Sequence, residues 1–290
     1  MFHDVRTIQS ARIARFGAGA TIVRSDRALA ESQIQNVAPS VFAESKHASR
    51  SERYTHIPTV EVLRGLAREG FHAFEVRQGG SRDADKRGFT KHLLRLRREG
   101  TALVGDSQRE VILLNSHDGT SSYQLMSGLF RMVCSNGLVV AEGEAHAIRI
   151  PHKGDIVQQV IEGAYRVIDT GAEIDRRVAE MRRIDLRPAE QEAFAEAASA
   201  LRFAGEASPV TPRQVNAPRR SADAGSDLWR TFNRAQENLT QGGLDYIHRN
   251  AETRAASRRS TRPVNGIDGN VTLNRALWVL SERMAELKAA

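Results

Sequence analysis

Two short polar segments hold the side chains best suited to acid–base or metal chemistry. Residues 115–122 (NSHDGTSS) follow a strongly apolar run, and residues 150–155 (IPHKGD) precede a long amphipathic pattern. Imidazole and carboxylate groups are ligands for Mn²⁺, Mg²⁺ or Zn²⁺. One interpretation is therefore a metal-dependent nuclease or other phosphoryl hydrolase, with a divalent metal as cofactor. Its three catalytic candidates are His117, Asp118 and His152.

A structural interpretation of the same segments competes with the first and is favoured. Neighbouring residues of an extended chain point to opposite faces, which separates His117 from Asp118. Asn, Ser and Asp side chains also stabilise turns by hydrogen bonding to nearby backbone. We therefore assign no metal site and expect no cofactor. We treat the segments as one polar centre, either a binding site or a structural turn, formed by Asn115, Ser116, His117, Asp118, Ser121, His152 and Lys153.

The densest charge lies between Arg77 and Arg98, where eight cations accompany two acids. We interpret residues 89–98 (FTKHLLRLRR) as a strand, because turn-forming residues precede it, although a helix would also align several of the cations. Lys and Arg neutralise phosphates in a sequence-independent way. This basic hairpin is expected to contact nucleic acid through Arg82, Lys86, Arg87, Lys91, Arg95 and Arg97. The alternative is a solvated hairpin whose charges protect a sheet edge from aggregation.

A second basic tract covers residues 248–263 (HRNAETRAASRRSTRP), with five arginines and one acid. We expect a flexible loop in which Arg254, Arg258 and Arg259 add nucleic-acid contacts, although such runs also serve as linkers. Base stacking has only scattered aromatic candidates, namely Tyr54, Phe89 and Tyr246.

The composition narrows the class of protein. The 290 residues carry a formal net charge of +7, which points weakly to polyanions because both signs are abundant. The single Cys134 excludes an internal disulfide and fits a buried thiol. We expect a cytoplasmic protein, because no run approaches the ~20 apolar residues of a membrane span and the N-terminus lacks a signal-peptide block. Phosphate-loop, dinucleotide, zinc-protease and serine-hydrolase motifs are absent, which argues against the commonest enzyme classes.

The apolar periodicity predicts an α+β fold. Helical spacing after Thr59, an apolar run at residues 71–76 and the run EVILL at 110–114 predict one helix and a mixed or antiparallel sheet that includes the basic hairpin. A long amphipathic helix from Asp155 to Met181 and a helical C-terminal region follow. The expected segments are an N-terminal arm (1–50), an α+β core with the long helix (51–204), a connector (205–226) and a helical region packed on the core (227–290).

Several stretches together resemble a known bacterial family. They include SRSERYTHIPTVEVLRGLAREGF, VILLNSHDGTSSYQLMSGLFRMVCSNGLVV, IPHKGDIVQQVIEGAYRVI and NGIDGNVTLNRALWV. Over nearly its whole length the chain is similar to the YfjQ/YafZ proteins of prophages, genomic islands and conjugative plasmids. The resemblance implies a bacterial cytoplasm and a mobile-element setting. It supplies no catalytic residues, since the family has no established activity.

The residues and the resemblance lead to one main function and two alternatives. We predict a non-enzymatic DNA-binding protein of a mobile element, with single-stranded DNA as one candidate form. The first alternative is the metal-dependent hydrolase described above. The second is a protein-interaction module that binds an acidic host factor. Self-association into a homo-oligomer is compatible with each of them.

Overall fold

The chain folds into two compact units, each with its own hydrophobic core. The computed structural model describes residues 12–15, 20–49, 56–101, 103, 105–131, 136–140, 147–151, 153–204, 207–250 and 252–289. Unit 1 comprises Met1–Gly128 and Glu144–Asp169, and unit 2 comprises Leu129–Gly143 and Thr170–Ala290. The boundary between the units falls inside residues 51–204, the segment expected to be a single core. One strand, Tyr123–Arg131, runs from unit 1 into unit 2.

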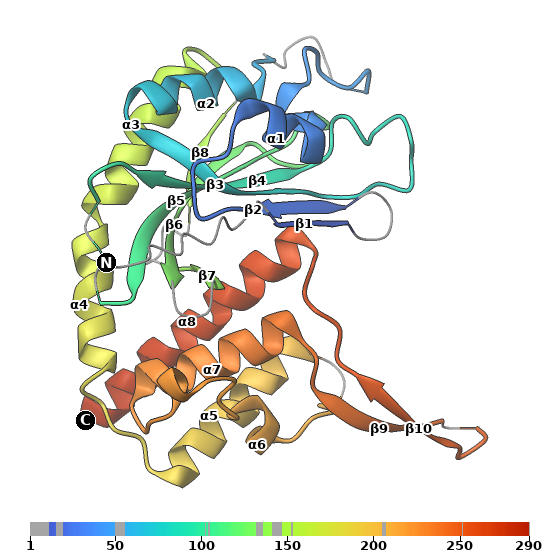
Figure 1. Cartoon of the computed structure of the whole chain (residues 1–290), viewed down its shortest axis with the longest axis vertical. Coiled ribbons are helices and arrows are strands. Elements are labelled where there is room, and N and C mark those ends of the chain that lie inside the picture. Colours follow the sequence, from blue (N-terminus) through green and yellow to red (C-terminus); the bar gives the residue numbers. More distant parts are fainter. Residues whose placement is uncertain are drawn as a thin grey trace, which may run out of the picture. The chain divides into compact units, whose positions relative to one another are not determined.

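A curled sheet forms the body of unit 1 (Figure 1). Its strands are β1 (Arg12–Arg15), β2 (Thr21–Arg24), β3 (Phe71–Gln78), β4 (His92–Arg98), β5 (Ser107–Asn115) and β6 (Tyr123–Arg131). They follow one another in sequence order, β8 (Ile148–Ile150) pairs with β6, and β7 (Asn136–Val139) of unit 2 ends the series. The pairs whose register is described are antiparallel.

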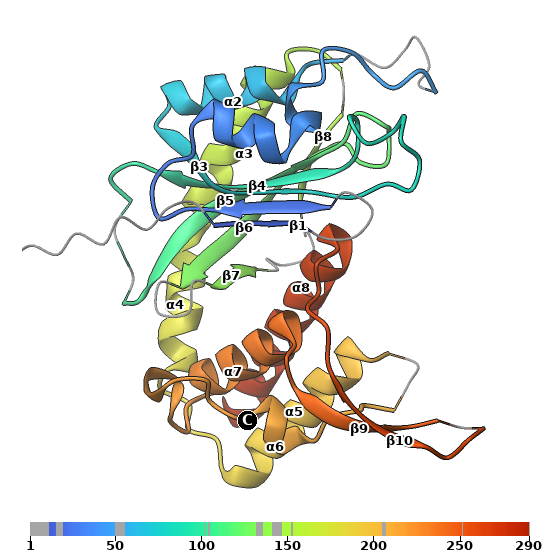
Figure 2. The ribbon, with the colours of Figure 1, turned by 45° about the vertical axis from the view of Figure 1, so that its right-hand side comes forward.

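Helices cover one face of this sheet. They are α1 (Glu31–Val37), the 3₁₀ helix η2 (Pro39–Phe42), α2 (Thr59–Arg68) and α3 (Ile156–Asp169), and Figure 2 shows α1, α2 and α3 on the same side. The apolar stripe of α2 packs with alternate residues of β4 such as Leu94 and Leu96 in one core. Gly163 lets α3 approach β6 closely, because a Cβ there would collide with Leu125. The α+β class and the antiparallel sheet are confirmed.

Unit 2 is mainly helical and is built around α7 (Leu228–Gln241). Around it lie α4 (Gly171–Met181), α5 (Pro188–Arg202), α6 (Pro212–Val215), η3 (Ser221–Asp223) and α8 (Ile267–Ala289). Every α7 residue from Leu228 to Thr240 except Arg230 is buried. Among the described residues, no helix is both long enough and apolar enough to span a membrane.

Three element predictions need correction. The long helix expected from Asp155 to Met181 is divided at Thr170 into α3 and α4, just before Gly171, a poor helix former. The expected connector contains α6 and η3, and its Val215 is fully buried. The flexible loop expected at residues 248–263 falls mostly within a two-stranded hairpin, β9 (Asp245–Arg249) with β10 (Ala256–Ser260).

Candidate functional site

The basic hairpin exists, but it does not present all of its cations to solvent. Strands β3 and β4 pair antiparallel, which confirms that residues 92–98 form a strand. Arg95 and Arg97, however, are only 1% and 6% exposed. Glu110 accepts from both guanidinium groups, at 2.8 Å from Arg95 and 2.9 Å from Arg97. The prediction that these two arginines face nucleic acid is therefore wrong.

The physical reason is that both faces of the sheet are buried at β4. Residues 94 and 96 pack under the helices, so strand alternation turns the arginines to the opposite face. There Glu75 contacts Arg77 and Arg24, each at 2.5 Å, and lies 3.8 Å from Arg95. Burial alone would raise the pKa of Glu75, but Arg77, Arg24 and Arg95 together hold that pKa well below its usual range. These cations complete a buried ion-pair ladder.

The other four cations that were predicted to contact nucleic acid lie on the loop that connects β3 and β4. Arg82 and Arg87 are exposed, and Lys86 and Lys91 are half-buried. Lys86 lies 3.7 Å from Asp83, and the Arg87 guanidinium donates to the backbone carbonyl of Ser81 at 3.2 Å. The loop therefore keeps a modest positive surplus, much smaller than the charge count of the whole hairpin suggests.

The NSHDG segment forms a turn whose inner residues are buried. Asn115, Ser116 and His117 are fully buried. Ser116 Oγ accepts from the backbone amide of Ser121 at 2.8 Å, and Asp118 Oδ1 accepts from that of Thr120 at 3.0 Å. The turn-capping interpretation holds for both side chains. His117 points inward while Asp118 stays at the turn, so the structure does not bring these two candidates together as a catalytic pair.

Sequence reasoning missed the centre into which His117 points. The Thr59 hydroxyl, at the start of α2, lies 2.9 Å from His92 Nε2 and 3.1 Å from His117 Nε2. Asn115 Nδ2 donates to the same oxygen at 3.1 Å, and the Tyr123 hydroxyl lies 3.3 Å away. The strands contribute from their ends: His92 begins β4 and pairs with Asn115, which ends β5.

Hydrogen bonds define a direction for the protons in this centre. Ser40 Oγ donates to Gln78 Oε1 at 2.9 Å, so it can accept from His92 Nδ1 at 2.9 Å. His92 Nε2 is then an acceptor for the Thr59 hydroxyl, which itself accepts from His117 and Asn115. Burial lowers the pKa of His92 to about 4, which favours this neutral form. The centre is a buried hydrogen-bond network that connects one end of the sheet to α2.

Lys153, another of the polar candidates, is exposed. His152 lies outside the described residues, as do Cys134 and Tyr54. Among the described residues, no group of three His, Cys, Asp or Glu side chains is placed to hold a metal ion.

The buried His92 predicts a loss of stability in acid. Its pKa in the folded chain, about 4, lies below the unfolded value near 6.5, so the unfolded chain takes up the proton first. The free energy of unfolding should therefore fall as the pH drops from 6.5 towards 4, by up to about 3 kcal/mol from this group. Urea unfolding at pH 7 and pH 4.5 measures the difference. The control variant His72→Gln, at a half-buried histidine of β3, should keep this dependence. An equal dependence in His92→Gln would contradict the assignment.

The β9–β10 hairpin, which we call the arginine ribbon (residues 245–260), carries four of the exposed arginines of unit 2. It projects from the helices of unit 2 in Figure 2. Its four arginines, Arg249, Arg254, Arg258 and Arg259, are all exposed, and so is every residue of β10. The acids of the described ribbon are Asp245 and Glu252, and Arg258 lies 2.6 Å from Asp245. This ribbon is ordered where the sequence suggested a flexible loop.

The base of the arginine ribbon is tightly fixed. The backbone of Gly243 and Thr261 pairs at 2.8 Å, and Thr261 donates to Leu244 at 2.9 Å. Gly242 has φ +67°, and a Cβ there would collide with the backbone of Thr261 and Arg262. Tyr246 and Leu244 pack against the core of unit 2. The ribbon thus has an anchored base and an exposed blade.

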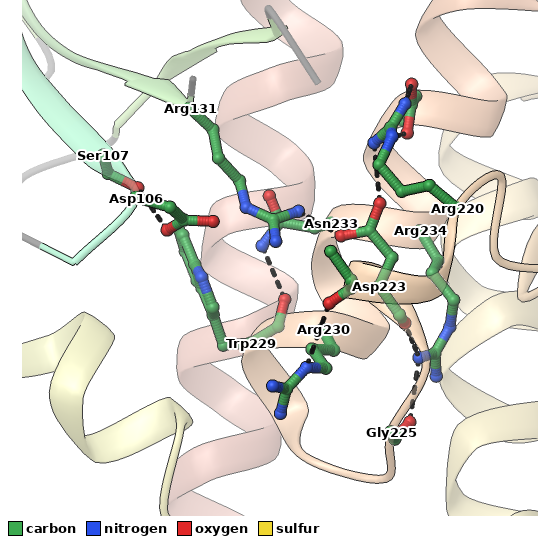
Figure 3. Close-up of polar contacts among 12 residues, drawn as sticks. Asp106, Ser107, Arg131, Arg220, Asp223, Gly225, Trp229, Arg230, Asn233 and Arg234 are labelled. Atoms are coloured by element: carbon green, nitrogen blue, oxygen red, sulfur yellow. Dashed lines mark hydrogen bonds and ion pairs between the residues drawn. The ribbon is translucent and has the colours of Figure 1, made fainter. Parts of the chain in front are cut away.

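Other arginines of unit 2 form ion pairs and hydrogen bonds within the unit (Figure 3). Arg131 forms a buried ion pair with Asp223, whose other oxygen lies 2.6 Å from Arg220. Arg220 also pairs with Glu237 at 2.5 Å. Arg234 donates at 2.8 Å to each of the backbone carbonyls of Asp223 and Gly225. These guanidinium groups hold the η3 segment against α7, so they do not contribute to a cationic surface.

Comparison with known proteins assigns the family. Residues 46–278 match the model described as Domain of unknown function (DUF932). The chain therefore belongs to the DUF932 family. It is 51% identical over 271 residues to each of two Escherichia coli K12 proteins, UPF0380 protein YafZ and UPF0380 protein YfjQ, covering 93% of this chain and 96% of each relative. The resemblance inferred from the sequence is confirmed. No solved structure matches the chain.

Proposed function

We propose that this protein binds nucleic acid, DNA in the mobile-element setting that the family resemblance implies, without catalysing a reaction on it. The observation that supports the proposal is the arginine ribbon, an anchored two-stranded blade with four exposed arginines. Cations displayed in this way suit a polyanion, because each phosphate that they neutralise releases counterions. The loop cations Arg82 and Arg87 of unit 1 are secondary candidates.

The acids near the ribbon do not cancel this role. The ion pair of Arg258 with Asp245 joins side chains that are 76% and 51% exposed. Exposed pairs of this kind contribute little to stability and are screened by salt, so a phosphate competes readily for the guanidinium group. The isolated ribbon also has little apolar support, since two-stranded hairpins are marginal in water. Binding along the blade would therefore stabilise its conformation.

Salt dependence of binding tests the proposal. A fluorescent 30-base-pair DNA is titrated with the protein at several salt concentrations, and the affinity is followed by anisotropy. Four to five phosphate contacts predict a slope of about −4 in a plot of log affinity against log salt. A slope near zero, or no binding at low salt, would contradict the proposal.

A further inference from the structure

The two faces of the arginine ribbon both carry positive charge. Cross-strand pairing sets Ile247 opposite Arg258 and Tyr246 opposite Arg259. Because successive side chains of a strand alternate between faces, Arg249 and Arg258 share one face and Arg259 lies on the other. Arg254 occupies the turn at the tip, with φ 57°. A polyanion bound to this ribbon therefore meets cations on two faces and at the tip.

This distribution favours a groove over a single strand. A single strand has one phosphate backbone and gains affinity by stacking its bases on aromatic side chains. The only aromatic ring of the described ribbon besides His248 is Tyr246, which packs against the core of unit 2. A groove of a duplex instead has phosphates along both walls. The major groove of B-form DNA is about 12 Å wide and admits a two-stranded ribbon, whereas the minor groove, about 6 Å wide, is too narrow.

An exposed apolar side chain on the arginine ribbon also supports duplex DNA as the ligand. Ile247 is 61% exposed and lies on the face of Arg249 and Arg258. A large exposed aliphatic group among arginines adds nothing to phosphate binding. At the floor of a major groove it would contact base edges, where thymine presents a methyl group.

We propose, on the basis of the proposed function above, that the arginine ribbon enters the major groove of duplex DNA. The face that carries Ile247, Arg249 and Arg258 meets base edges on the floor of the groove, while Arg254 at the tip and Arg259 on the outward face contact phosphates of the walls. The anchored base at Gly242 and Thr261 keeps the helices of unit 2 outside the groove. Double-stranded RNA is excluded as the occupant, because its major groove is deep and too narrow for side chains to read.

Three probes of equal length test this inference: a 30-base-pair DNA duplex, one of its strands, and the corresponding RNA duplex. The DNA duplex should bind at least about tenfold more tightly than either other probe, and methyl green, a major-groove ligand, should displace the protein where netropsin, a minor-groove ligand, does not. Ile247→Ala should weaken duplex binding about fivefold, as expected for lost apolar contact. The matched variant Val279→Ala, at an exposed apolar site on α8, should bind as the parent does.

The outcomes separate this inference from the proposed function. Equal or tighter binding of the single strand or the RNA overturns the major-groove inference while ribbon-dependent binding of nucleic acid stands. Displacement by netropsin alone also overturns it. Absence of binding to all three probes overturns the proposed function itself.

Discussion

Replacing Arg249, Arg254, Arg258 and Arg259 with alanine should weaken DNA binding about 10²-fold. Non-specific dissociation constants are about 10⁻⁴ to 10⁻⁶ M for proteins that make six to ten phosphate contacts. Each contact therefore tightens binding about fourfold on average. Four lost contacts therefore account for the expected change in affinity. The negative slope of log affinity against log salt should become shallower by about 4. Because these side chains are exposed, the urea midpoint should stay within the range of surface substitutions.

A charge-matched variant separates a local ribbon effect from net charge. Arg27, Arg68, Arg176 and Arg183 are exposed arginines outside the ribbon, and alanine at all four also removes four positive charges. This variant should bind within a few fold of the parent protein. Equal weakening by the two variants would mean that overall charge, rather than the ribbon, governs binding.

The second large effect concerns the buried ladder in unit 1. Glu110→Gln should lower the free energy of unfolding by about 3 to 5 kcal/mol, because removing one member of a buried ion pair leaves the other charge unpaired. The carboxylate is fully buried and serves both Arg95 and Arg97. Urea unfolding followed by circular dichroism reports both units. Tryptophan fluorescence reports unit 2 alone, since both tryptophans, Trp229 and Trp278, lie there.

An exposed carboxylate in the same unit provides the control. The Glu99 side chain is 76% exposed and lies 3.0 Å from His72. Glu99→Gln should change the free energy of unfolding by less than about 0.5 kcal/mol. A loss below 1 kcal/mol in Glu110→Gln would show that the ladder contributes far less than its burial indicates.

Local patterns identified the basic hairpin because strand alternation and turn residues are encoded over short distances. They did not show which face of β4 is covered. Arg95 and Arg97 alternate with leucines as exposed residues of a half-buried strand would, and their carboxylate partner Glu110 lies on the next strand. Charge counted along the sequence therefore overestimated the charge available at the surface.

The arginine ribbon was not predicted because its strands lack an apolar alternation. Each cross-strand residue pair of the ribbon includes a polar side chain. The turn depends on Asn250, whose side chain accepts from the backbone amides of Glu252 at 2.9 Å and Thr253 at 2.8 Å. An Asn at the start of such a turn, after the β-favouring pair Tyr246 and Ile247, is the signal that indicates a hairpin.

For the polar centre, the sequence identified some of the residues but not their partners in the fold. The sequence marked residues 115–118 as unusual, and Asn115 and His117 do belong to a buried network. Their partner Thr59 is 56 residues from Asn115, and His92 approaches it only because β4 pairs with β5. Partners that are brought together only by the tertiary fold leave no local sequence pattern. The buried network could therefore be identified only from the structure.

Amide hydrogen exchange of the whole protein, with and without duplex DNA, tests the central claim most directly. At a DNA concentration 100 times the dissociation constant, amides of residues 245–260 should exchange up to about 10²-fold more slowly, because opening of the ribbon must then compete with binding. Amides of β3 to β6 should be unchanged. Protection of the 79–91 loop with unchanged exchange in the ribbon would contradict the account.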